Sequence, residues 1–191
     1  MKLQKTTWAL VITALFLTTF VYLHEVVGKS QQEVQAAKQR KIFDFRKEDI
    51  QGFTIEREKE KLVFERVDKE TKFWQIKEPE ESPANDQAVS FLLELLAKGE
   101  RDRLILARSE ELEEYGLSEP LVTVSIALEN RSQPYILLLG KENFDRKFIY
   151  ARVNPDKNEK KSIEIILIPM DFKYAVEREL EEWKAKEKDE G

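Results

Sequence analysis

The chain has 191 residues and a formal net charge of −5, a length that suits one globular domain with appendages. Of its 32 basic and 37 acidic residues, six basic and two acidic residues fall within residues 1–41, which leaves 26 and 35 in residues 42–191. This acidic body argues against nucleic acid as a partner. There is no cysteine and the one histidine is His24, so disulfides, cysteine nucleophiles and histidine metal sites in the body are excluded.

An apolar segment without a charged side chain occupies residues 6–23. At about 1.5 Å per helical residue it spans roughly 27 Å, enough to cross the hydrocarbon core of a bilayer. Trp8 and Tyr22 lie near its two ends, where aromatic rings favour the headgroup level, and we expect them to anchor it at the interfaces. We therefore predict a cytoplasmic tail at residues 1–5 and a transmembrane signal anchor at residues 6–27, in contact with the lipid bilayer.

The charges around this segment favour a cytoplasmic N-terminus and a body on the other side, because Lys2 and Lys5 precede it. The alternative is a secretory signal cleaved before Lys29. The apolar run is longer than the roughly 7 to 15 residues of a usual signal core and no Ala-x-Ala follows it, which favours the anchor. Residues 28–41 then form a predicted helical stalk, rich in Gln, Lys and Ala and too poor in apolar residues for a coiled coil.

The first half of the body, residues 42–99, predicts an antiparallel meander followed by a helix. Short β-type runs at residues 53–55, 62–64 and 73–76 are separated by charged segments, the pattern of strands with one face in water. Ser82 is the predicted N-cap and Pro83 the first residue of the helix, which Gly99 ends. Its predicted buried stripe is Ala88, Leu92, Leu95 and Leu96, widened by Val89 and Leu93.

The second half repeats this plan after a strand at residues 103–106 and a short helix capped by Ser109 and ended by Gly116. Further strands are predicted at 121–128, 135–139, 148–153 and 163–168. Asp171 is the predicted cap of a last helix with Phe172, Val176, Leu180 and Trp183 on its apolar side.

The predicted fold class is therefore α+β, with antiparallel β-meander sheets and about three packed helices, preceded by one transmembrane helix. The extracytoplasmic domain is predicted at 42–183, with a charged tail at 184–191. Its halves, 42–99 and 121–183, form a candidate pseudo-repeat.

Two short motifs invite a chemical interpretation and both fail on spacing. Gly140-Lys141 lacks the earlier glycine and the following Ser or Thr of a phosphate loop. Asn154, Asp156 and Asn158 begin like a calcium loop, but Glu159 and Ile165 replace the required glycine and final glutamate. We predict no catalytic, cofactor-binding or metal-binding residues.

Aromatic and basic residues beside turns are better candidates for an interaction surface. Trp74 is one aromatic candidate, although its place on a β-strand is also that of a core residue. The predicted interaction surface consists of Tyr115, Phe144, Tyr150, Lys141 and Lys147.

An ordered set of short runs resembles the domain-of-unknown-function family numbered 4340. The runs are WQIKEP at 74–79, PAN at 83–85, YGLSEP at 115–120, LLGK at 138–141 and YAR at 150–152. The N-terminal anchor, with IFDF at 42–45 after the stalk, resembles its cyanobacterial single-pass members. The resemblance implies no catalytic residue or cofactor. Some members resemble accessory components encoded near gliding-type ABC transporters, which suggests a membrane complex as partner.

We therefore expect a non-catalytic accessory or interaction module of a membrane complex, anchored with its body in the periplasm or thylakoid lumen and bound to another membrane protein. The alternative is a module that binds an envelope glycan or small solute through aromatics around Phe144 and Tyr150. A third interpretation is a carboxylate-dependent hydrolase, since acidic residues are abundant.

Overall fold

The computed structural model describes residues 39–68, 73–156 and 162–186. The predicted cytoplasmic tail and transmembrane segment, with Trp8 and Tyr22, lie outside the described residues, as does most of the predicted stalk. Within the described ranges, no helix has the length and apolar character needed to cross a membrane.

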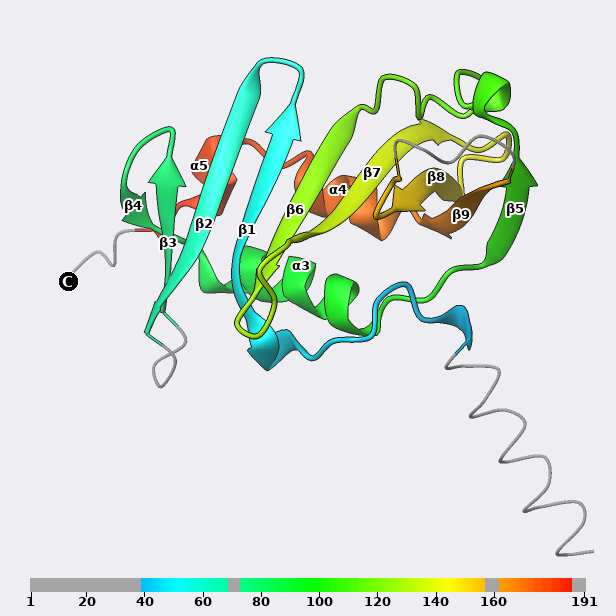
Figure 1. Cartoon of the computed structure of the whole chain (residues 1–191). Coiled ribbons are helices and arrows are strands. Elements are labelled where there is room, and N and C mark those ends of the chain that lie inside the picture. The colour runs from blue at the N-terminus through cyan, green and yellow to red at the C-terminus, as the bar shows by residue number, and fades with distance from the viewer. Residues whose placement is uncertain (1–38, 69–72, 157–161, 187–191) are drawn as a thin grey trace, which may run out of the picture. The chain divides into compact units, whose positions relative to one another are not determined.

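One antiparallel sheet of nine strands forms the framework, in the order β4-β3-β2-β1-β6-β7-β8-β9-β5 (Figure 1). The strands are β1 (Ile50–Arg57), β2 (Glu60–Asp68), β3 (Phe73–Glu78), β4 (Ser82–Pro83), β5 (Arg103–Ala107), β6 (Val122–Leu128), β7 (Tyr135–Glu142), β8 (Phe148–Val153) and β9 (Ile163–Pro169). The helices are α3 (Asp86–Lys98), α4 (Asp171–Val176) and α5 (Leu180–Trp183), with 3₁₀ turns η2 (Lys47–Asp49) and η3 (Ser109–Glu111). The predicted α+β class with an antiparallel sheet and three helices is confirmed for the described residues.

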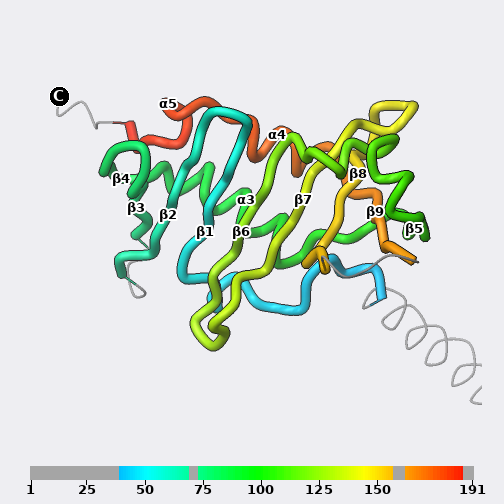
Figure 2. Tube along the Cα trace, turned by 45° about the horizontal axis from the view of Figure 1, so that its top comes forward, coloured from blue at the N-terminus to red at the C-terminus, as the bar shows by residue number. Residues whose placement is uncertain are grey.

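Two meanders build this sheet outward from its centre. β1 and β6 pair antiparallel in the middle, from Ile50 opposite Leu128 to Arg57 opposite Val122. From there β2, β3 and β4 follow on one side, and β7, β8 and β9 on the other, with β5 added beyond β9. A helix follows each meander, and α3, α4 and α5 lie on the same side of the sheet (Figures 1 and 2). The sheet therefore has a helical face and, within the described residues, an opposite face that only the segment around η3 covers, at the end formed by β7, β8, β9 and β5.

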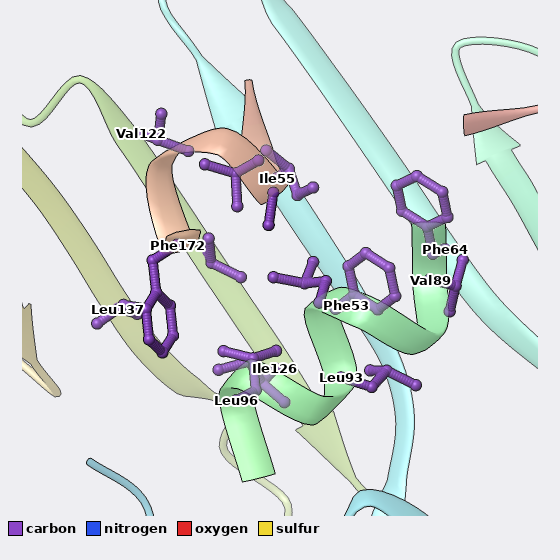
Figure 3. Close-up of a cluster of buried hydrophobic side chains, with 14 of the residues drawn as sticks. Phe53, Ile55, Phe64, Val89, Leu93, Leu96, Val122, Ile126, Leu137 and Phe172 are labelled. Carbon is purple, nitrogen blue, oxygen red and sulfur yellow. The ribbon is translucent and has the colours of Figure 1, made fainter. Parts of the chain in front are cut away.

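The main core lies between the sheet and the helices. Phe53 and Ile55 of β1 point toward the helices and are at most 2 % exposed. Glu56, the next residue along the strand, is exposed. Figure 3 shows strand residues such as Phe64 and Ile126 facing α3 and Phe172 of α4. Burying each such side chain stabilises the fold by about 1.5–3 kcal/mol, so the alternating pattern determines which face the helices cover.

The predicted start of the first helix is wrong by three residues. Ser82 and Pro83 form strand β4 against Ile76 and Gln75, and α3 begins at Asp86. Asn85 is the N-cap, since its side-chain oxygen accepts hydrogen bonds from the backbone N–H groups of residues 87 and 88, at 3.0 and 3.4 Å. The preceding segment is held to the sheet edge by tertiary hydrogen bonds, which a local capping pattern does not register.

The buried stripe of α3 is largely as predicted. Leu92 and Leu96 are fully buried and Leu95 is only partly buried at the margin of the core. The helix ends at Lys98, and Gly99 takes the C-cap position as predicted.

The other two predicted helices also differ from those observed. Ser109 is the first residue of the 3₁₀ turn η3 and not its cap, because Arg108 precedes it in extended conformation and its backbone N–H donates to Glu111 Oε2 at 2.7 Å. Asp171 is the first residue of α4 and not its cap, because Met170 takes the N-cap position. The last predicted helix is two short ones, because Glu179 is extended and starts a new turn through a 3.0 Å hydrogen bond to Glu182. All four of its predicted apolar residues still contact the core.

Candidate interaction site

Three of the five predicted surface residues come together on the face of the sheet opposite the helices. Tyr115 lies on the turn after η3, and its ring packs edge-on against Tyr150 of β8, with centroids 4.8 Å apart. Both rings pack on a second, smaller apolar cluster. Its buried members are Ala107, Leu117, Ile163 and Ile165. The two tyrosines are therefore only partly exposed and hold the residue 109–117 segment against the sheet.

Lys141 lies beside the two tyrosines, and its hydrogen bonds hold the 109–117 segment on β7. Its backbone N–H donates to the carbonyl oxygen of Tyr115 at 2.8 Å, and its Nζ donates to the carbonyl oxygen of Glu113 at 2.9 Å. The segment can come this close to β7 because two glycines permit it. Gly116 has φ +70°, and Gly140 has no Cβ, which would otherwise lie 2.2 Å from the Tyr115 carbonyl oxygen. Glycine at both positions lets the turn dock on β7.

The other two predicted residues, Phe144 and Lys147, lie on the hairpin turn between β7 and β8. Asn143 Oδ1 accepts hydrogen bonds from the backbone N–H groups of Lys147 and Phe148, at 3.1 and 3.0 Å. Asp145 Oδ1 accepts a second bond from Lys147 N–H at 3.1 Å. The turn is thus held by side-chain hydrogen bonds while its phenyl ring is entirely in water, with an exposed fraction of 103 %.

An ion pair ties this hairpin to the helical layer. Lys173 Nζ of α4 lies 2.5 Å from Glu142 Oε1 at the end of β7. This hydrogen bond lowers the pKa of Glu142 and raises the pKa of Lys173, because each stabilises the charged form of the other. Arg146 is also exposed on the turn, 3.9 Å from Glu142, and it has φ 56°. We name residues 143–147 the hairpin tip.

The structure places Trp74 elsewhere, as a core residue. It is 3 % exposed, packs on Phe53 with ring centroids 5.4 Å apart, and has the guanidinium of Arg66 5.1 Å from its ring centroid. Trp74 is therefore not available as a contact residue. The turn-forming residues Asn143 and Asp145, which hold the hairpin tip, were missed at the sequence level although their types are those of turns.

Four carboxyl groups in the described residues accept hydrogen bonds that favour their charged form. Side-chain hydrogen bonds lower the pKa of Asp49, of Glu94 and of Glu142, from Arg46, Lys98 and Lys173 respectively. A hydrogen bond from the Arg108 backbone lowers the pKa of Glu111. A general acid needs the opposite shift, toward the neutral form. Over the described ranges, no three potential metal-ligating side chains cluster together.

A surface cleft of 660 Å³ opens at the β4 edge. Its lining consists of Ser82, Pro83, Glu181, Lys184, Ala185 and Lys186. Lys184 Nζ is already paired with Glu80 at 2.5 Å and with Glu181 at 2.7 Å. The cleft therefore presents a basic group whose charge is satisfied internally, and it lies apart in sequence from Phe144 and Tyr150.

The comparison with known families gives one match. Residues 74–187, from β3 through α5, match the family described as Domain of unknown function (DUF4340). Neither a curated protein nor a solved structure matches the chain. The match begins at Trp74 and so covers less of the chain than the resemblance did; β1 and β2, in the middle of the sheet, lie outside it. From β3 onward, the chain belongs to the DUF4340 family.

Proposed function

We propose that this protein is a non-catalytic, membrane-anchored interaction module that binds another membrane protein through its hairpin tip. The observation that carries the proposal is Phe144, a large apolar side chain wholly in water on a turn held by hydrogen bonds. Because the backbone of the turn is held, an aromatic ring on it offers contact area at a low cost in conformational entropy. Rings of this kind are common anchors at the centre of protein interfaces.

Two further features support the proposal. The exposed Arg146 and Lys147 lie on the same turn and supply hydrogen-bond donors for the rim of an interface. The apolar segment at residues 6–23 has the length of a membrane anchor, which would keep the body close to membrane proteins. We infer an extracytoplasmic location from the lysines before that segment.

Site-specific photocrosslinking tests this function. The full-length protein carries p-benzoylphenylalanine in place of Phe144 and is irradiated in the membranes of the organism that produces it. The matched control carries the same group in place of Tyr174 of α4, which is 60 % exposed. The expected result is a discrete crosslinked membrane protein at position 144 that is absent at position 174.

A second measurement ties the product to function. Phe144→Ser should reduce co-purification of that membrane protein by about tenfold or more, as for an anchor residue worth at least roughly 1.4 kcal/mol. Tyr174→Ser should leave it unchanged. If both positions give the same products, or position 144 gives none, the hairpin tip is not the binding surface.

The alternative function, binding of an envelope glycan or small solute, is favoured by the 660 Å³ cleft beside Ser82, whose buried Oγ has no hydrogen-bond partner among the described residues. A ligand that fits there would raise the melting temperature, because it binds only the native state. A fragment screen by thermal shift, repeated with Lys184→Ala, separates this function from the first.

A further inference from the structure

The edge strand β5 is a candidate for a second contact surface. β5 pairs with β9, from Arg103 opposite Leu167 to Ala107 opposite Ile163. Among the described residues, no strand pairs with its outer side (Figure 1). In an antiparallel ladder alternate residues turn their N–H and C=O groups away from the neighbour, so this edge offers free backbone groups.

The usual protections of an edge strand are lacking at β5. Its five residues include no proline, and Arg103 is its only charged residue. Leu104 and Leu106 are 37 % and 65 % exposed and lie on the same side of the strand. The other side of the strand is occupied, because Ile105 and Ala107 pack in the second apolar cluster. An uncovered edge with a leucine pair is the kind of strand that adds a further strand.

We propose that the partner of this edge is a second copy of the chain, with the two β5 strands antiparallel and Ile105 on the twofold axis. In this register Leu104 lies opposite Leu106 of the second copy, and the reverse pair repeats it. Asp102 lies opposite Arg108 of the second copy at both ends. The sheet then continues from one copy into the next with the helical faces on the same side.

The local sequence selects this register over its neighbours. Centring the pair on Leu104 would place Leu106 opposite Asp102, and centring it on Leu106 would place Leu104 opposite Arg108. Only the axis at Ile105 matches apolar with apolar and acid with base. Both charged residues are exposed, and Arg108 continues the extended backbone of β5 at φ −94° and ψ 160°. Its guanidinium also lies 3.3 Å from Glu111 Oε1, so in the dimer Asp102 would share Arg108 with that carboxylate.

The expected dimer is concentration-dependent. A five-residue strand buries less than the roughly 1,600 Å² of a standard interface, so the association belongs to the weak class. Confinement to a membrane, as in the proposed function, would raise the local concentration and favour it. The pairing itself uses β5 and not the hairpin tip, so it stands or falls separately from the proposed function.

Cysteine pairing in the full chain tests the register, since the natural sequence contains no cysteine. Leu104→Cys and Leu106→Cys variants are oxidised with diamide, alone and mixed in equal amounts. We expect the mixture to form roughly tenfold more disulfide dimer than either variant alone, because opposed cross-strand side chains lie within reach of a disulfide and diagonal ones do not. Ile105→Cys, on the axis, should form the dimer by itself.

Leu121→Cys is the matched control, since Leu121 is 51 % exposed and lies outside β5. Melting temperatures of all variants establish that each is folded. If Leu104→Cys or Leu106→Cys alone reacts as well as the mixture, the proposed register is overturned. If no β5 variant exceeds Leu121→Cys, β5 does not pair with a second copy, and the edge is left for a strand of another protein.

Discussion

At the β4 edge of the sheet the chain covers its own last strand, whereas at the β5 edge the described part of the chain leaves five residues uncovered. Ala185 N–H donates to the carbonyl oxygen of Pro83 at 2.9 Å, and Asn85 N–H donates to that of Trp183 at 2.7 Å. Behind this seal Trp183 is fully buried, with its ring centroid 4.9 Å from that of Phe64. β5 has no such cover among the described residues, and Leu106 remains 65 % exposed.

This contrast separates the parts of the molecule that stabilise it from those that are available for contacts. The sealed end combines aromatic packing with hydrogen bonds between segments about 100 residues apart in the chain. The open end combines an uncovered strand with the hairpin tip. Substitutions at the first should therefore cost stability, and substitutions at the second should cost binding.

The largest expected effect is at the sealed end. Trp183→Ala removes a fully buried indole that packs against Phe53 and Phe64, and we expect the free energy of unfolding to fall by about 3–5 kcal/mol. Leu106→Ala, at the open end, should change it by less than about 0.5 kcal/mol. Urea unfolding followed by circular dichroism measures both, and equal losses would contradict the contrast.

A smaller loss is expected where the 109–117 segment docks on β7. Gly116→Ala places a side chain at φ +70° and a Cβ 2.6 Å from Lys141 Cγ. The left-handed backbone and the displaced lysine should together cost about 1–3 kcal/mol. Ser118→Ala, in the exposed part of the same turn, is the control and should be nearly neutral. The same urea titration separates them.

The helix start gives a test of the revised cap. Asn85→Ala removes the acceptor for two backbone N–H groups and the 3.1 Å bond from Nδ2 to the carbonyl oxygen of Glu182, so we expect a loss of about 0.5–2 kcal/mol. Ser82→Ala should cost less, because Ser82 lies in β4 and caps nothing. A larger loss at Ser82 would restore it as the cap.

The smallest effect concerns pH at the base of the hairpin tip. Folding lowers the pKa of Glu142 from its ordinary 4.5, so its contribution to stability is present above pH 4.5 and is lost as the pH falls through its folded pKa. Lys173 has a raised pKa, so its contribution is present below 10.5 and is lost as the pH rises through its folded pKa. Glu142→Gln should therefore lower the melting temperature between these limits and approach wild type beyond them. Glu119→Gln, at an exposed position, is the matched control.

Much of the sheet could be predicted from the sequence because alternation is a local property. The eight runs predicted as strands all correspond to strands, and β4 was the strand that was missed. The apolar positions of α3 were also correctly predicted, since they follow from helical spacing. The membrane anchor and the extracytoplasmic location remain predictions, because residues 1–38 lie outside the described residues.

The candidate site was predictable residue by residue but not as an arrangement. Tyr115, Lys141 and Tyr150 were chosen separately for their types, and only the docking of the 109–117 segment on β7 and β8 brings them together. This docking uses Lys141 for an internal hydrogen bond and leaves Phe144 exposed for contact with a partner. Some side chains make internal contacts and others stay available for a partner. The difference depends on which distant segments lie side by side, and the sequence does not show this.

The sequence by itself determined which side of each strand and helix is apolar, because burial follows the periods of 2 and 3.6 residues. Only the tertiary structure decided that Asn85 caps α3, that the C-terminal segment closes the β4 edge and that no described strand covers β5. Caps and edges are settled by competition for backbone hydrogen bonds between distant segments. That competition depends on long-range contacts, which no local pattern contains.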